Sequence, residues 1–146
     1  MNQPSKKAPD LNLTFGQILR TKIEFKETDT WRNKFLIVVG EDKKAGESLF
    51  FITTSQIEKI PPSELVQSSM IHIKPDEVDC FKLATVIDCR TVHRRSRKWF
   101  EDLFGKSLLS VRDTLPQVYQ DKIKQVVFNT PFISQHHRSI ILSGFK

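Results

Sequence analysis

Apolar and polar positions along the first two thirds of the chain follow the pattern of short β-strands. From Leu19 to Phe25, three apolar residues and one threonine take every second position, and charged residues stand between them, as in a strand with one buried face. Four later segments are apolar runs of strand length or are rich in β-branched residues. The five predicted strands are 19–25, 35–39, 49–53, 70–73 and 84–92. A polar turn at 40–47 separates the second strand from the third, and Pro61 with Pro62 breaks the chain in the loop before the fourth.

Helical periodicity begins after the fifth predicted strand. Ser96 is suited to cap a short helix that ends at Gly105. The apolar residues of this helix are Trp99, Phe100, Leu103 and Phe104. Thr114 and Gln117 have the spacing of a capping box, and Pro116 stands in the first turn of a second helix, where its missing N–H costs nothing. One face of the second helix carries Leu115, Val118, Tyr119, Ile123, Val126 and Val127.

Strands joined without helix-length connections disfavour a parallel βαβ sheet. The order of elements predicts a mainly β, α+β fold: a small, strongly curved sheet or barrel with about two helices packed at its end. Residues 1–14 are polar and contain two prolines, so we expect a flexible leader there. The folded domain is expected over 15–128. The tail 129–146, which contains Ile140–Leu142, is expected to be an edge strand or a partner-contact segment.

Composition restricts the class of protein. The chain has 146 residues, 38% of them hydrophobic, which suits one globular domain. No apolar run has the roughly 18–20 residues that span a membrane, and the N-terminus lacks the apolar stretch of a secretory signal. Cys80 and Cys89 are too few for a disulfide scaffold. We therefore expect a cytoplasmic protein with no membrane partner.

The net charge of +6 is unevenly distributed. Residues 1–40, 41–80 and 81–146 contribute +3, −4 and +7. In the last block, five basic side chains fall within nine residues that contain no acid: Arg90, Arg94, Arg95, Arg97 and Lys98. Such a cluster either contacts phosphates, with release of counterions, or forms a solvated basic face. The cluster alone leaves both interpretations open.

Familiar nucleotide-binding and metal motifs are absent from the sequence, including G-x-x-x-x-G-K-[ST], G-x-G-x-x-G, H-E-x-x-H and C-x-x-C. His136 and His137 are adjacent and point apart in an extended segment, so we expect a surface pair and no metal or other cofactor. A more distinctive group is the polar stretch 28–34, which precedes a buried strand, together with 53–56 at the end of the next strand.

If these two strands are antiparallel neighbours, Arg32 or Lys34 faces Thr54 across the sheet. Cations beside a hydroxyl can bind a phosphate and stabilise negative charge during phosphoryl transfer. The alternative is that polar residues simply accumulate where strands end, and spacing alone does not separate the two.

These residues carry a resemblance to the MazF/PemK-like toxins of bacterial toxin–antitoxin systems. The family opens with Gly-Asp and a hydrophobic strand, and Gly16-Gln17-Ile18 stands in that place. Its Arg-Pro before an apolar strand resembles Lys34–Val39, and its strand ending Ile-Thr-(small)-Gln resembles Ile52–Gln56. Its Ser/Thr-bearing strand, which runs into a basic segment and a helix, is similar to 81–97. The resemblance covers roughly residues 15–128.

The resemblance implies an SH3-like barrel, a homodimer and a cognate antitoxin protein as partner. It also implies metal-independent cleavage of single-stranded RNA, in which the ribose 2′-OH attacks the adjacent phosphate and leaves a cyclic phosphate and a 5′-hydroxyl. The family's catalytic Arg falls at Lys34 and its Thr at Thr54. Lysine keeps the charge but loses the planar fork that grips a phosphate, and Arg32, two residues earlier, is expected on the same side and can substitute.

The expected catalytic residues are therefore Lys34, Arg32 and Thr54. The expected RNA-binding residues are Trp31, Thr53, Ser55, Gln56, Arg94, Arg95 and Arg97. Trp31 either stacks on an unpaired base or anchors the loop at the end of the barrel. Two other functions are open for the same fold: a nucleic-acid-binding module that does not cleave, and a toxin directed at another protein.

Overall fold

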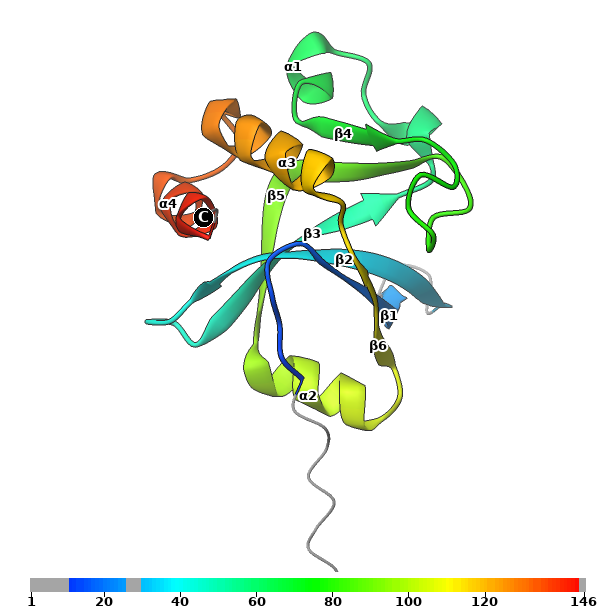
Figure 1. The fold of residues 1–146 in the computed structure, drawn as a ribbon, viewed down its shortest axis with the longest axis vertical. Helices are drawn as coiled ribbons and strands as arrows, with labels where there is room; N and C mark the ends of the chain where they lie inside the picture. The colour runs from blue at the N-terminus through cyan, green and yellow to red at the C-terminus, as the bar shows by residue number, and fades with distance from the viewer. Residues whose placement is uncertain (1–10, 26–29, 145–146) are drawn as a thin grey trace, which may run out of the picture.

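The computed structural model describes residues 11–25 and 30–144, with the side chains of 23–33 outside that description. Six antiparallel strands form one sheet in the spatial order β4-β5-β3-β2-β1-β6 (Figure 1). The strands are β1 (Gln17–Phe25), β2 (Thr30–Asp42), β3 (Glu47–Thr54), β4 (Met70–Ile73), β5 (Thr85–Ser96) and β6 (Leu109–Thr114). Register shifts in three of the pairings bend the sheet.

The described residues confirm the α+β class and leave the barrel prediction unconfirmed. Within the described part of the chain, β4 and β6 are the two edges, and no strand pairing joins them to close the sheet. The helical segments are η1 (Ile57–Lys59), α1 (Glu64–Gln67), α2 (Arg97–Gly105), α3 (Gln117–Asn129) and α4 (Gln135–Ser143).

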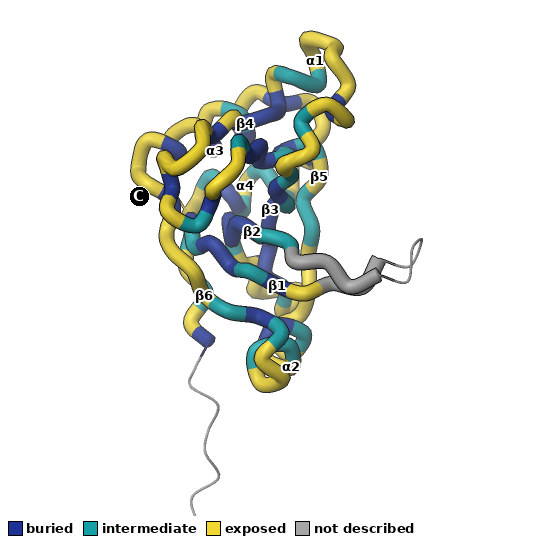
Figure 2. The backbone as a smooth tube through the Cα atoms, turned by 90° about the vertical axis from the view of Figure 1, so that its right-hand side faces the viewer, coloured by how far each residue is buried: buried dark blue, intermediate teal, exposed yellow. Residues whose placement is uncertain are grey.

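The helices cover both faces of the sheet. Side chains alternate along each strand, so successive residues of one strand enter different cores. On one face, Ile37 packs in a core with Ile123 of α3 and Ile141 of α4. On the other face, Leu36 packs in a second core with Phe100 of α2. Figure 2 shows this arrangement as buried central strands between α2 and the α3–α4 pair, whose outer surfaces are exposed. Ser96 caps α2 as predicted, since its Oγ accepts a hydrogen bond from the backbone N of Trp99 at 3.2 Å.

The tail contains a helix and not the predicted edge strand. Ser134 starts α4 by accepting a hydrogen bond from the backbone N of His137 at 3.2 Å. Ile141 is fully buried, and α4 lies directly on β2, where a Cβ on Gly40 would come within 3.2 Å of Ile140. The apolar triplet that indicated a strand is therefore the buried side of a short helix.

Two further boundaries differ from the prediction. Residues 109–114 form an unpredicted strand, β6, so Thr114 ends a strand and Pro116 caps α3 without a side-chain hydrogen bond. The predicted leader, 1–14, extends too far: Leu11 is buried, and Arg97 Nη2 donates to its carbonyl oxygen at 2.8 Å. Residues 1–10 lie outside the described residues.

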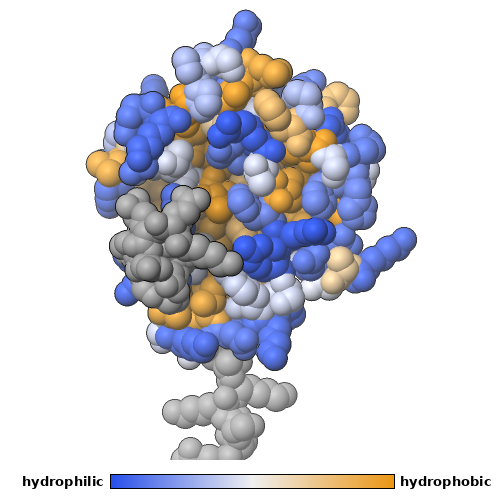
Figure 3. All heavy atoms as spheres, turned by 180° about the vertical axis from the view of Figure 1, so that it is seen from behind, coloured by the Kyte–Doolittle hydropathy of each residue, from blue (hydrophilic) through white to orange (hydrophobic). Residues whose placement is uncertain are grey.

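Some apolar side chains lie on the surface. Figure 3 shows the back of the molecule, where apolar side chains are visible between hydrophilic ones. The large exposed apolar residues are Leu65, Leu83, Val111, Val118, Phe128 and Phe132. Exposed apolar residues are normal in folded proteins, but Leu83 also lines the pocket described next.

Candidate functional site

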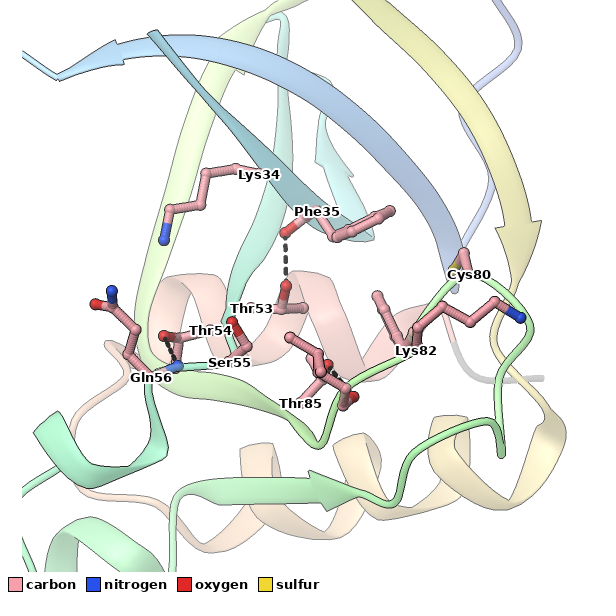
Figure 4. Close-up of a pocket in the computed structure, with 11 residues that line it drawn as sticks. Lys34, Phe35, Thr53, Thr54, Ser55, Gln56, Cys80, Lys82 and Thr85 are labelled. Atoms are coloured by element: carbon pink, nitrogen blue, oxygen red, sulfur yellow. Dashed lines mark hydrogen bonds between the residues drawn. The ribbon is translucent and has the colours of Figure 1, made fainter. Parts of the chain in front are cut away.

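Lys34 and Thr54 face each other across the two central strands. β2 and β3 pair antiparallel with Leu36 opposite Ile52, and the same register continued by two residues sets Lys34 opposite Thr54. In Figure 4 the Lys34 amine extends toward Thr54 and Gln56. On its other side Lys34 pairs with Thr21 of β1. Of the two cations expected near Thr54, Lys34 is therefore the one that the described side chains place beside it.

The end of β3 is fixed by hydrogen bonds of its two threonines. Thr53 is buried and donates from Oγ1 to the carbonyl oxygen of Phe35 at 3.2 Å, which ties β3 to β2. Thr54 Oγ1 accepts from the backbone N of Gln56 at 3.0 Å and so closes the turn that ends the strand. With this bond accepted, the Thr54 hydroxyl retains its proton for donation.

A pocket of about 400 Å³ opens beside these residues. Its walls come from β2, from the end of β3 and from the loop that leads into β5. Phe35 and Phe81 form an edge-to-face pair within it, with ring centroids 5.1 Å apart. Burial, followed by the charge of Asp113, raises the pKa of Cys80, another lining residue, so its thiol stays protonated at neutral pH. The pocket thus has an apolar side and a rim of hydroxyl and amino groups.

A second pocket of about 280 Å³ adjoins the first. The two share Lys34, Thr53, Thr54 and Gln56, so Lys34 and Thr54 lie between two hollows of one groove. The second pocket adds charged and aromatic side chains: Lys59, Asp88, Arg90 and His93. Burial, followed by the charge of Arg95, lowers the pKa of His93, so its ring is neutral at pH 7.

Arg90 and Asp88 form an ion pair in the groove. Arg90 Nε donates to Asp88 Oδ1 at 3.1 Å, and Nη2 donates to Oδ2 at 2.9 Å. Burial acts to raise the pKa of Asp88, but the hydrogen bonds and charge of Arg90 outweigh it and hold that pKa below its usual range. The same pairing raises the pKa of Arg90. Both groups are therefore ionised at neutral pH.

The structure brings together part of the site expected from the sequence. Lys34, Thr53, Thr54, Ser55 and Gln56 all line the first pocket. The backbone of Trp31 and Arg32 lies in β2, opposite Glu24 and Ile23, and their side chains lie outside the described residues.

The other three arginines of the basic cluster, Arg94, Arg95 and Arg97, lie outside this groove. Arg94 pairs with Leu49, five residues along β3 from Thr54, which is about 16 Å of extended chain. The contacts of these arginines are with neighbouring side chains: Arg94 with Glu47 at 3.8 Å, Arg95 over Trp99 at 5.6 Å, and Arg97 with Glu101 at 3.5 Å. Arg94, Arg95 and Arg97 are thus not among the groove's lining residues.

Sequence reasoning did not assign Lys59, Arg90 or His93 to the site. In the sequence, Arg90 is only one member of a charge cluster. In the structure, the pairing of β5 with β3 separates Arg90 from the other members. Among the described residues, no group of three or more His, Cys, Asp or Glu side chains is placed to hold a metal ion. His136 Nε2 lies 2.9 Å from Asp42 Oδ2, in a contact that joins α4 to the β2–β3 hairpin.

Comparisons with known proteins do not identify a family. No protein-family model and no curated protein matches this chain. None of the helices in the described residues is long and apolar enough to cross a membrane.

Proposed function

We propose that the protein is a metal-independent endoribonuclease that acts on single-stranded RNA, as the resemblance to MazF/PemK-like toxins implies. The observation that carries the proposal is the placement of Lys34 opposite Thr54, between two pockets of one groove. A phosphate held at this junction leaves room for an unpaired base on each side. Unpaired, splayed bases are the form in which proteins read single-stranded RNA.

The chemistry follows from these groups. The ribose 2′-oxygen attacks the adjacent phosphorus, so a new P–O2′ bond forms while the P–O5′ bond breaks. The 2′-OH proton passes to water, and the leaving 5′-oxygen takes up a proton from water. Lys34 balances the charge that develops on the phosphate, and the Thr54 hydroxyl donates to one of its oxygens. The products are a cyclic phosphate and a 5′-hydroxyl.

Features of the fold support the same proposal. A strand that runs into a basic segment and a helix is what the resemblance leads us to expect, and β5 continues directly into α2. A strongly bent, six-stranded sheet is compatible with the SH3-like barrel of that family. The homodimer and the antitoxin partner belong to the same proposal.

One observation favours a second candidate, a module that binds RNA without cutting it. Lys34 stands where the family has arginine, and an ammonium cannot grip two phosphate oxygens in one plane as a guanidinium does. The Lys34→Arg variant separates the candidates, because it restores the planar fork without a change in charge.

The test is cleavage of a mixed RNA pool in EDTA, with end-group analysis of the fragments. We expect fragments that end in cyclic phosphate, and we expect Thr54→Ala to slow cleavage about 10²-fold, the effect typical of a lost transition-state donor. Thr54→Ser retains the hydroxyl and should stay close to wild type. Lys34→Ala should be impaired, whereas Lys106→Ala, on an exposed lysine that does not line the groove, should not be. Intact RNA retarded on a gel indicates the binding module, and neither cleavage nor retardation refutes both candidates.

A further inference from the structure

The Asp88–Arg90 pair presents a guanidinium in a fixed orientation within the second pocket. The two residues are two positions apart on β5, at the register shift between β5 and β3, and their ion pair shows that the two side chains lie together. Two parallel hydrogen bonds of 3.1 and 2.9 Å hold the guanidinium plane. Asp88 Oδ1 also accepts from the Arg90 backbone N at 3.0 Å, which fixes the carboxylate. The two side chains are 29% and 30% exposed, so the pair is neither buried nor fully solvated.

The pair has hydrogen-bond donors to spare. A guanidinium carries five N–H groups, and Asp88 accepts two of them. Among the described residues, no other side chain or carbonyl accepts a hydrogen bond from the Arg90 guanidinium. Three N–H groups therefore remain, and two of them, one on Nη1 and one on Nη2, point in parallel along one edge of the fork. Two adjacent donors on a rigid plane fit a ligand with two adjacent acceptors.

The charge of the Asp88–Arg90 pair favours a neutral ligand over an anionic one. A phosphate offers adjacent acceptor oxygens, but at Arg90 the ionised Asp88 carboxylate repels it, so within this pocket a phosphate is drawn to Lys34 or Lys59 in preference to Arg90. A neutral base edge with two acceptors meets no such repulsion. Among the bases, guanine presents O6 and N7 as adjacent acceptors, whereas adenine presents N7 beside an N6 donor. Unpaired cytosine also presents two adjacent acceptors, N3 and O2, so the wider ring of the purine distinguishes guanine from cytosine.

We propose that the second pocket binds a guanine base through donation from Arg90 to O6 and N7. This inference rests on the proposed function, since it assigns a specificity-determining residue to the same groove. The pocket shares Lys34 and Thr54 with its neighbour, so a guanine there lies next to the phosphate held at the junction. His93 lines the same pocket, and its ring stacks on Phe50 with centroids 5.6 Å apart. A flat, neutral ring of this kind suits the wide face of a purine.

The test measures binding without cleavage. Fluorescein-labelled 2′-O-methyl hexanucleotides lack the attacking hydroxyl, and their affinity is measured by fluorescence anisotropy. Each is a uridine strand with one variable base: guanine, adenine, cytosine, hypoxanthine, 7-deazaguanine or 2-aminopurine. The flanking uridines let the strand slide, so the protein selects which base enters the pocket. We expect guanine and hypoxanthine, which both carry O6 and N7, to bind about tenfold tighter than the others, as is typical of a bidentate base contact.

Two variants connect this preference to Arg90. Arg90→Lys keeps the charge but loses the fork, and should remove the guanine preference while leaving the affinity for all-uridine strands within about twofold. Arg94→Lys makes the same change on the same strand outside the groove and should leave both unchanged. Equal binding of guanine and 7-deazaguanine, or a guanine preference that survives Arg90→Lys, would overturn the proposal. An equal loss of affinity for every strand in Arg90→Lys would instead place a phosphate at Arg90, and no binding of any strand would refute a site for RNA in this groove.

The proposed cleavage is judged separately. A guanine preference in protein that does not cleave RNA in EDTA refutes the nuclease and supports the base site. Cleavage by protein that shows no base preference in the binding assay refutes the base site and supports the nuclease.

Discussion

The docking of α4 on the sheet is the structural feature that differs most from the sequence prediction, and Ile141→Ala tests it. Ile141 is fully buried in the core that also contains Ile37 and Ile123. The substitution removes three carbon atoms from that core, which at about 0.8 kcal/mol for each buried methylene amounts to roughly 2.4 kcal/mol of lost transfer free energy. A residual cavity adds to this, so we expect the free energy of unfolding to fall by about 3–4 kcal/mol.

The assay is urea unfolding followed by circular dichroism, with thermal unfolding as a second measurement. For a chain of this length a loss of about 3–4 kcal/mol corresponds to a decrease of roughly 10 °C in the melting temperature. Val118→Ala is the matched control, because Val118 is 57% exposed on the neighbouring helix α3 and should change stability by less than about 0.5 kcal/mol. A loss below about 1 kcal/mol in Ile141→Ala would mean that α4 does not pack on the sheet in solution.

Two further predictions concern titratable groups. A hydrogen bond from His136 holds the pKa of Asp42 below its usual value of 3.8, so the stabilisation by ionised Asp42 is complete above that pH and is lost as the pH falls through the folded-state pKa. Urea midpoints at several pH values should therefore show Asp42→Asn less stable than wild type at pH 6, with the difference shrinking below about pH 4; a constant difference would contradict the role of this contact. Burial raises the pKa of both thiols, with Cys89 fully buried and Cys80 only partly so. In native protein at pH 8, an aromatic disulfide reagent should modify Cys80 slowly and Cys89 only after unfolding, and rapid reaction of both would show that the core opens.

Most strands were predictable because each lies in a sheet with two covered faces. Segments such as 35–39 are apolar at every position, since odd and even residues enter different cores. β6 carried no such signal: only Leu109 is buried, and the rest of the strand is half-exposed or exposed. Its pairing with β1, and not its own composition, makes it a strand. The same holds for α4, whose apolar triplet suits a strand or a helix equally well.

The candidate site was partly predictable for a related reason. Two consecutive strands joined by a short turn bring the start of β2 beside the end of β3, which can be expected from the sequence. A one-residue register shift between Val38 and Gly40 then decides that Lys34 stands opposite Thr54. Arg90 reaches the groove through β5, which pairs with β3 only after a register shift of three residues between the Phe50–His93 and Ile52–Asp88 pairs. A shift of that kind leaves no signal in hydrophobic periodicity.

The sequence by itself determined the α+β class, the positions of the five main strands and the expectation that Arg32 or Lys34 lies near Thr54. Each of these depends on interactions between neighbouring segments of chain, where alternation and turn length decide the outcome. Only the tertiary structure decided that the basic cluster divides, with Arg90 in the groove, Arg94 and Arg95 at the far end of β5, and Arg97 at the start of α2. The reason is physical: charges close in sequence share a net charge, but strand direction, register and local ion pairs determine where each one acts.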